Sequence, residues 1–340
     1  MIDTTAALAH LDALAKPRGS LGALEAVAAR LAATQGTLKP QTRPRRIVLF
    51  AADHGCVAAG VTAWPSAVTG LMVGTIAAGK AASSVLARNT GTDLRLVDVG
   101  TLGPKLDPAP DFYHYAPVRA GTGNLAVEPA MTATEYNKAS DTVGEGEAHL
   151  AHLAGCRVVA AGEMGIGNTT PSSCLAMLLA NVSLEDAVGP GAGSDRAVMA
   201  RKREVVAAAV QRARALFDDD PQSAIAEVAG LEIVAMAGFY EQAANLGMTI
   251  VLDGYVSGAA ALIAQHRDPS CTSRMIAGHC SAEPGHRAVL TKLGLTPVLD
   301  WSMRLGEGTG ALLAMPMLDA AAAVLSEMAT LADLGVGRQD

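Results

Sequence analysis

Residues 157–180 read RVVAAGEMGIGNTTPSSCLAMLLA and are the clearest indication of the fold class. This stretch begins with a short apolar run, passes through a turn that contains three glycines, and continues as an apolar segment with helical character. A buried strand, a glycine turn and a helix in this order form the repeating unit of parallel α/β proteins. The stretch therefore predicts one strand–helix unit of a layered α/β fold.

The glycine turn of this stretch is a candidate anion site. Its spacing, G-x-x-G-x-G, matches neither the Walker A loop nor the dinucleotide fingerprint. Glycines let backbone N–H groups approach an anion at the positive end of the following helix. Thr169 or Thr170 is the predicted cap of that helix, and Pro171 suits its first position. Tight packing alone would also explain the glycines, but Glu163 within the turn favours a functional role.

The same pattern recurs along the chain. Apolar runs without strict alternation, typical of strands covered on both faces, occur at 46–52, 94–99, 157–161, 232–237, 248–252, 274–277 and 297–299. Helical patterns lie at 68–87, 134–153, 195–216 and 255–265. This alternation predicts a doubly wound, mostly parallel α/β sheet. Two helical segments outside it, 20–34 and 318–334, are predicted to pair as a small helical subdomain.

Composition and charge disfavour several classes of protein. Only 17% of the residues are charged and the formal net charge is −7, which argues against nucleic acid, because binding it requires clustered Lys and Arg. The five cysteines form no C-x-x-C pair and are expected to be buried free thiols. Since neither a signal peptide nor an apolar run of membrane-spanning length is recognisable, we expect a cytoplasmic protein without a membrane partner.

Polar residues and glycines follow the predicted strands, at the edge where the carboxyl ends of the strands meet. These segments are Asp53-His54-Gly55, Asp98-Val99-Gly100, residues 162–168, Ala237-Gly238, Asp253-Gly254, Gly278-His279 and residues 300–308. In open α/β sheets, ligands bind at this edge. The pattern therefore predicts a ligand site there.

A second glycine turn, from Gly189 to Gly193, precedes a helix that Ser194 or Asp195 is predicted to cap. Lys202 falls about two turns into that helix. An ammonium group there could meet a phosphate, although a lone lysine on a helix is more often solvated.

Glu307 lies between Gly306 and Gly308, in a segment predicted to reach the ligand edge. A flat ligand can approach this carboxylate closely, because no neighbouring Cβ intervenes. Most loop carboxylates are simply solvated, but the surrounding turn residues make this one a candidate site residue.

A divalent metal site built from Asp53, His54, His279 and Asp253 is the competing interpretation. These residues would suit a metal-dependent phosphohydrolase, but they lack H-E-x-x-H or any other compact ligand spacing. We therefore expect no metal ion.

The motifs taken together resemble the nicotinate-nucleotide–dimethylbenzimidazole phosphoribosyltransferase family, which makes the lower-ligand nucleotide of cobalamin. The matching pieces run in family order across nearly the whole chain: KPRGSLG at 16–22, ADHG at 52–55, GEMGIGNTT at 162–170, Asp253-Gly254, HCSAEPGH at 279–286 and MRLGEGTGA at 303–311. The resemblance implies a three-layer α/β domain (residues 40–310), a small helical domain (1–39 plus 311–340), and a homodimer. It implies no cofactor.

The resemblance also implies roles for individual residues. Glu307 matches the catalytic carboxylate. The positions that match nucleotide contacts are Glu163, Gly165, Gly191, Gly193, Lys202 and Ser281. The matching motifs add Asp253, Gly254 and Met303 as substrate-binding candidates, and the segment 64–72 adds Ser66.

Two segments depart from the family pattern. Residues 64–72 read WPSAVTGLM where many members read YPQEVTxQM, at a helix start that helps line the pocket for the base in the family. The identity of the base therefore stays open among benzimidazoles, purines and phenolics. Residues 189–193 read GPGAG where GRGTG is common, so an arginine is missing near the phosphate.

The predicted reaction moves the phosphoribosyl group of nicotinate mononucleotide to 5,6-dimethylbenzimidazole or a related base. Nicotinate leaves from a pyridinium without an acid, and Glu307 takes the proton of the incoming ring as general base. The two alternatives are the metal-dependent phosphohydrolase and a non-catalytic relative that binds a nucleotide or base.

Overall fold

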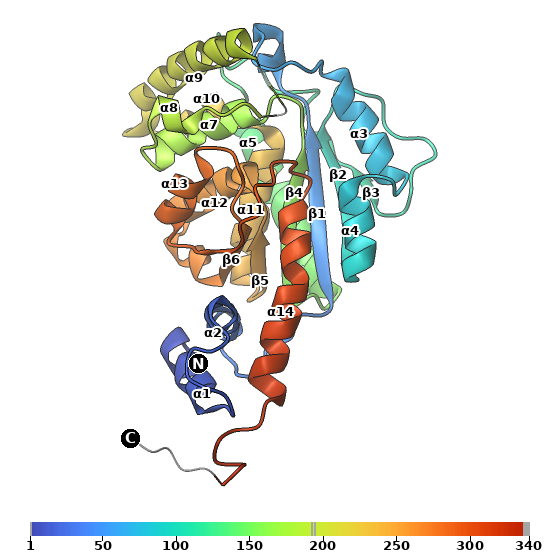
Figure 1. Cartoon of the computed structure of the whole chain (residues 1–340). Helices are drawn as coiled ribbons and strands as arrows, with labels where there is room; N and C mark the ends of the chain where they lie inside the picture. Colours follow the sequence, from blue (N-terminus) through green and yellow to red (C-terminus); the bar gives the residue numbers. More distant parts are fainter. Residues whose placement is uncertain (1, 192, 194, 336–340) are drawn as a thin grey trace.

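The computed structural model describes residues 2–191, 193 and 195–335. Its centre is a seven-stranded sheet in which all paired strands are parallel, in the order β3-β2-β1-β4-β5-β6-β7 (Figure 1). The strands are β1 Arg45–Ala52, β2 Asp93–Gly100, β3 Tyr113–Tyr115, β4 Val158–Met164, β5 Thr249–Leu252, β6 Met275–His279 and β7 Pro297–Leu299. The strand order reverses between β1 and β4, so a ligand site is expected beyond their carboxyl ends.

The sheet is the middle of three layers, as predicted, because alternate side chains of β1 enter different cores. Val48 and Phe50 belong to one core, and Ile47 and Leu49 to the other. The first core includes α5 Ala133–Asn137, α6 Glu145–Leu153, α7 Thr169–Leu179, α8 Leu184–Ala187, α9 Arg196–Phe217, α10 Pro221–Val228, α11 Leu231–Asn245, α12 Tyr255–Arg267 and part of α13 His286–Leu293. The second includes α1 Thr4–Ala13, α2 Ala23–Gln35, α3 Ala67–Ala77, α4 Ala82–Thr90 and α14 Thr309–Glu327.

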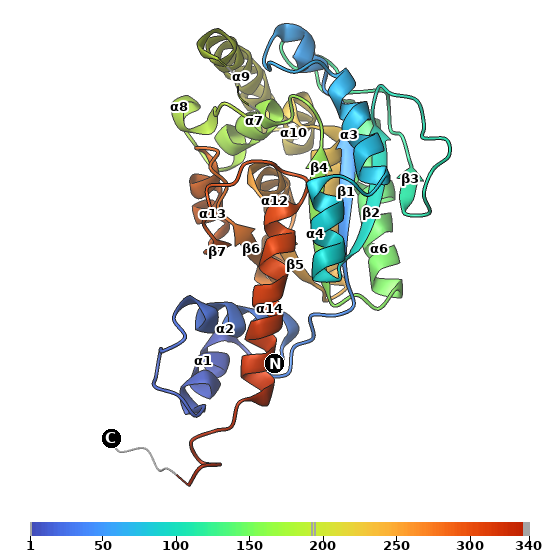
Figure 2. The same cartoon turned by 45° about the vertical axis from the view of Figure 1, so that its right-hand side comes forward.

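The two chain ends meet in a helical region at one end of the molecule. Figures 1 and 2 show α1 and α2 beside the far end of α14, the helix that also packs on the sheet. The backbones of Leu14 and Thr330 form a short antiparallel bridge there. The helix predicted at 318–334 is this α14, which begins earlier and ends at Glu327. The division into 40–310 and 1–39 plus 311–340 stays a prediction.

The strand predicted at 232–237 is wrong: these residues lie in α11. All residues from Leu231 to Tyr240 are buried, so the helix has no polar face here and its apolar run resembles a buried strand. Gly238 is accordingly not a strand end. A Cβ at this position would lie 2.4 Å from the Ser140 carbonyl oxygen, so the glycine permits close helix packing.

Three further elements differ from the prediction. The helix predicted at 68–87 is two helices, α3 and α4, separated at Gly79, whose φ is +72°. The helix predicted at 134–153 is α5, a π-helical segment Lys138–Gly144 and α6. The short strand β3 was not predicted, because three residues give no periodicity.

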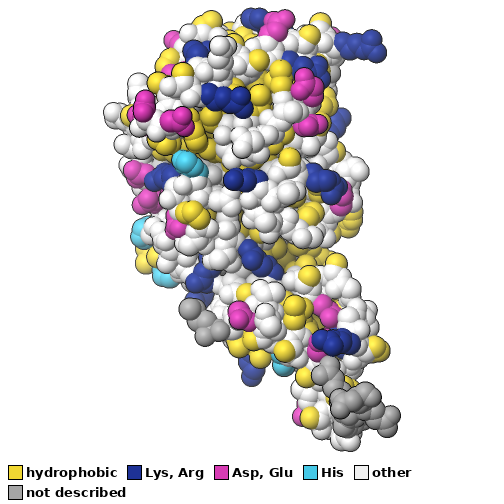
Figure 3. Space-filling view, turned by 90° about the vertical axis from the view of Figure 1, so that its left-hand side faces the viewer, with side chains coloured by type: hydrophobic (Ala, Val, Ile, Leu, Met, Phe, Trp, Pro, Cys, Tyr) yellow, Lys and Arg dark blue, Asp and Glu magenta, His cyan; other side chains and the backbone are white. Residues whose placement is uncertain are grey.

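Two segments, Ala67–Thr90 and α14, are long and apolar enough by composition to cross a membrane. The first is broken at Gly79, and α14 packs against α2, α4 and β6. Both therefore belong to the folded α/β protein. Figure 3 shows acidic and basic side chains interspersed on the face that it presents. The five cysteines are buried free thiols, as expected.

Candidate active site

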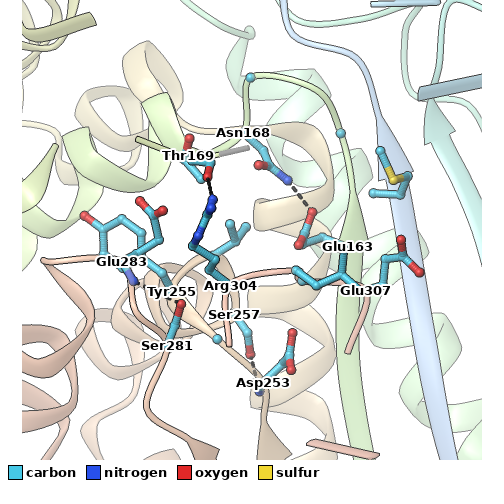
Figure 4. Close-up of a pocket in the computed structure, with 18 of the residues that line it drawn as sticks. Glu163, Asn168, Thr169, Asp253, Tyr255, Ser257, Ser281, Glu283, Arg304 and Glu307 are labelled. Atoms are coloured by element: carbon cyan, nitrogen blue, oxygen red, sulfur yellow. Dashed lines mark hydrogen bonds between the residues drawn. The ribbon is translucent and has the colours of Figure 1, made fainter. Parts of the chain in front are cut away.

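A polar cavity of about 120 Å³ lies at the carboxyl ends of β4, β5 and β6 (Figure 4). The structure brings seven of the predicted site residues together in its lining: Glu163, Gly165, Gly191, Asp253, Gly254, Ser281 and Glu307. Lys202 of α9 lines neither cavity but donates to Thr169, a residue of this lining, and Met303 lines a second cavity beside it. Gly193 and Ser66 line neither cavity, although Ser66 precedes α3 directly.

The first glycine turn joins β4 to α7 under tight spatial limits. A Cβ on Gly165 would lie 2.5 Å from the Ala52 carbonyl oxygen, and Gly167 has a φ of +93°. The predicted cap is wrong: Asn168 is the N-cap residue, and Thr169 begins the helix. The Asn168 side chain makes no capping bond, because it donates instead to the Glu163 carboxyl.

Glu163 is a buried carboxyl group that holds a proton near neutral pH. Burial raises its pKa to about 8, and the neighbouring carboxylates of Asp253 and Glu232 add to this effect. A Cβ on Gly306 would lie 2.2 Å from Glu163 Oε1. Glycine at position 306 therefore lets the loop that carries Glu307 lie close to Glu163.

Glu307 stands at the junction of the two cavities and lines both of them. Its side chain is almost fully buried, and its backbone φ of +56° is rare for a residue other than glycine. The Ser83 hydroxyl of α4 donates to Glu307 Oε2 at 3.0 Å. Burial raises the pKa of Glu307, which makes the carboxylate a stronger base.

Asp253 holds the Glu307 loop in this position. Its carboxylate accepts from the backbone N–H of Gly310 at 2.7 Å, and from Gly308 and Ala311 at 3.1 and 3.2 Å. Asp253, which directly follows β5, thereby satisfies backbone N–H groups at the start of α14. Both carboxylate oxygens are thus engaged by backbone donors.

Lys202 is buried, so the interpretation of it as a solvated helix lysine is wrong. Its ammonium donates to Thr169 Oγ1 at 2.8 Å and to the Gly189 carbonyl oxygen at 3.0 Å, joining the two glycine turns. Burial lowers its pKa to about 8. Asp195 caps α9 by accepting from the Val198 amide, whereas Ser194 lies outside the described residues.

Arg304 connects the second glycine turn with the Glu307 loop. Its guanidinium donates to the Gly191 carbonyl oxygen at 2.6 Å, and the side chain lines both cavities. Arg304 thus brings a positive charge to the turn at residues 189–193, where this chain lacks the arginine that is common in the family.

The second cavity is apolar, with a volume of about 760 Å³. Its apolar lining residues are Trp64, Val68, Met72, Ala82, Leu86, Met164, Ile166, Met303, Leu305 and Leu313. Among the described residues of this lining, Glu307 alone is acidic. A flat apolar ring held here would meet a carboxylate at its polar edge.

The residues proposed for a metal site are engaged in other contacts. His54 Nε2 lies 2.9 Å from Glu232 Oε1, and Asp53 accepts from the Leu102 amide. His279 Nε2 lies 3.7 Å from Asp253 Oδ1. Within residues 2–191, 193 and 195–335, no three His, Cys, Asp or Glu side chains form a group that could hold a metal ion.

Sequence reasoning missed four residues of the site: Asn168, Arg304, Ser83 and Glu283. Asn168 and Arg304 stand inside the glycine-rich motifs and could have been found there. Ser83 carried no local signal, because its contact with Glu307 joins residues 224 positions apart.

Comparisons with known proteins agree with this geometry. A family described as phosphoribosyltransferase matches residues 3–336. Nicotinate-nucleotide–dimethylbenzimidazole phosphoribosyltransferases from Cupriavidus taiwanensis and Pseudomonas aeruginosa are each 44% identical over 328 residues, covering 96% of this chain and 93% and 92% of theirs. The crystal structure of CobT from Thermus thermophilus superposes with a TM-score of 0.93 at 43% identity, covering 99% of both chains.

Proposed function

Because this chain belongs to the nicotinate-nucleotide–dimethylbenzimidazole phosphoribosyltransferase family, we propose that it moves the phosphoribosyl group of nicotinate mononucleotide to dimethylbenzimidazole or a related base. The products are α-ribazole 5′-phosphate and nicotinate, and the reaction serves the assembly of the nucleotide loop of cobalamin. The observation that carries the proposal is the position of Glu307 between a polar and an apolar cavity.

The polar cavity suits the nucleotide. The two glycine turns offer backbone donors, and positive charge comes from Arg304 in the lining and from Lys202, which donates to the lining residue Thr169. Gly254 and Ser281 line the remaining wall. Glu163, protonated near neutral pH, adds no charge that would repel the anionic donor.

The apolar cavity suits the acceptor ring, which would present one nitrogen to the ribose carbon and the other to Glu307. As the ring nitrogen attacks, the bond between the ribose carbon and the pyridinium nitrogen breaks, and nicotinate leaves with a neutral ring nitrogen. The ribose carbon passes through an oxocarbenium-like state. The second ring nitrogen becomes acidic and gives its proton to the Glu307 carboxylate. The negative charge of this carboxylate also stabilises the positive charge that develops on the ring.

Asp253 acts as a positioning residue in this scheme, since its oxygens are occupied by the backbone of the Glu307 loop. The sequence instead predicted Asp253 as a residue that binds the substrate directly. Substrate contacts by Gly193 and Ser66 gain no support from the lining of either cavity. A homodimer and a cytoplasmic location are further parts of the proposal, and they rest on the family resemblance.

The test is an incubation of the purified protein with nicotinate mononucleotide and a panel of bases, measuring released nicotinate and identifying the nucleotide product. Release that depends on an aromatic base and persists in a chelator supports the transferase. Chelator-sensitive release of inorganic phosphate would instead indicate the phosphohydrolase, and binding without turnover would indicate a non-catalytic relative.

A further inference from the structure

The proposed chemistry leaves one buried charged group of the polar cavity unused. Glu283 lines this cavity and is 5% exposed, and neither oxygen of its carboxyl group has a hydrogen-bond partner among the described residues. Buried polar groups are nearly always hydrogen-bonded, so an orphan carboxyl group in a ligand cavity indicates a partner supplied by the ligand.

Glu283 lies beside the second glycine turn, where the proposed function places the phosphate. A Cβ on Gly189 would be 2.2 Å from Glu283 Oε2, so the second glycine turn packs directly on this carboxyl group. The Lys202 ammonium binds the carbonyl oxygen of the same glycine. Figure 4 shows the Glu283 side chain in the part of the cavity that also holds Thr169 and Arg304.

A carboxylate and a phosphate dianion cannot both occupy this end of the cavity without strong repulsion, because burial weakens screening by water. One proton between them turns the repulsion into a short O–H···O⁻ hydrogen bond. We propose that Glu283 binds the phosphate of the donor nucleotide together with one proton, as a carboxylic acid that donates to a phosphate oxygen. The inference rests on the proposed function, because it takes nicotinate mononucleotide as the donor.

The surroundings of Glu283 are consistent with this role. The charged and titratable groups that face it are Lys202 from α9, Tyr255 from α12 and Arg304 from the loop after β7. Burial raises the pKa of Glu283, while Lys202, the nearby Gly191 amide and Arg304 oppose the rise. The pKa of Glu283 thus lies above its ordinary value before a ligand binds, and a bound dianion would raise it further and favour the protonated form.

The experiment is calorimetric titration of the whole protein with nicotinate mononucleotide between pH 6 and 8.5, in buffers of different ionisation enthalpy, which counts the protons taken up. Nicotinate riboside, which lacks the phosphate, is the matched ligand. E283Q is the test variant, and E204Q, at an exposed carboxylate on α9, is the control.

The wild type and E204Q are expected to take up about one more proton with the nucleotide than E283Q does. As the pH rises, the nucleotide affinity of these two proteins should fall more steeply than that of E283Q. The additional loss is at most about tenfold for each pH unit. With the riboside, all three proteins should behave alike. The comparison of proton uptake is made near pH 6, where Lys202 and Glu163, whose pKa values are about 8, already hold their protons and take up none, because E283Q also shifts the titration of Lys202 at higher pH.

Equal proton uptake by the wild type and E283Q would overturn the inference, as would an equal loss of nucleotide and riboside affinity in E283Q, which indicates a ribose contact. If E283Q does not fold, the wild type decides near pH 6, where Lys202 and Glu163 are already protonated: uptake with the nucleotide alone supports the inference, and no uptake or equal uptake with both ligands overturns it. Absence of any nucleotide binding overturns the proposed function as well, whereas binding without the proton overturns only the role of Glu283.

Discussion

The two cavities on either side of Glu307 are built in different ways. In the polar cavity, most side chains are fixed by specific partners: Lys202 by Thr169 and Gly189, Asn168 by Glu163, and Arg304 by Gly191. The apolar cavity is larger and offers mainly hydrocarbon surface. Directional bonds select strongly between ligands, whereas apolar surface discriminates only by size and shape. We therefore expect strict recognition of the donor and broader tolerance for the acceptor.

The largest expected effect comes from the junction of the cavities. Glu307→Gln keeps the size and the Ser83 hydrogen bond but removes the base, so turnover should fall by about 100- to 10,000-fold. Initial rates of nicotinate release measure this loss, and the dissociation constant of the nucleotide should stay unchanged. Near-full activity in this variant would contradict the role of Glu307.

Replacing the residue that holds the junction should have the next largest effect. Asp253→Asn loses an acceptor for the Gly308, Gly310 and Ala311 amides, so the Glu307 loop should shift. A displacement of about 1 Å costs up to about 100-fold in rate. We expect kcat to fall with little change in the KM of the nucleotide. A rise in the KM of the nucleotide at unchanged kcat would indicate a substrate contact instead.

On the donor side, Lys202→Met should raise the KM of the nucleotide by about 10- to 100-fold, because it removes a charged hydrogen-bond donor. Wild-type affinity should also weaken above pH 8, since the ammonium of Lys202, whose pKa burial lowers to about 8, then loses its proton. Lys138→Met, at a lysine that donates to the Pro117 carbonyl, is the control. Equal KM values in both variants would show that Lys202 does not bind the phosphate.

On the acceptor side, Met303→Ala should raise the KM of the base by only about tenfold, because it removes apolar contact area and no directional bond. Steady-state kinetics with dimethylbenzimidazole measure this change, and the KM of the nucleotide serves as an internal control. An effect confined to the nucleotide would contradict the assignment of the apolar cavity to the base.

The smallest effect concerns stability. The pKa of Glu163 is raised in the folded protein to about 8 from an ordinary value of 4.5, so folding favours its protonated form. The stabilisation is complete below pH 4.5 and is lost as the pH rises through 8. Between pH 5 and 8, the Tm of the wild type should therefore fall relative to the Tm of Glu163→Gln. Parallel Tm curves in thermal scans would contradict the raised pKa.

The difference between the cavities also explains what the sequence could predict. Glycine turns are local, so residues 162–170 and 306–308 were recognisable without a structure, and strand ends could be assigned to one edge. The contact of Ser83 with Glu307 and the effect of Glu232 on the pKa of Glu163 arise from distant elements and leave no local pattern.

Local sequence patterns also gave a wrong prediction where a helix is buried on all sides. The apolar run at 232–237 lacks a polar face in either secondary structure, so periodicity could not identify α11. Lys202 was ambiguous for the opposite reason, because a charged side chain on a helix is usually exposed and only the fold shows that this one is buried.

The most direct test is a crystal structure of this protein with dimethylbenzimidazole bound. We expect the ring to lie in the apolar cavity, against Met303 and Met164, with one ring nitrogen about 3 Å from a carboxylate oxygen of Glu307. A base bound elsewhere, or one with both nitrogens out of hydrogen-bonding reach of Glu307, would contradict it.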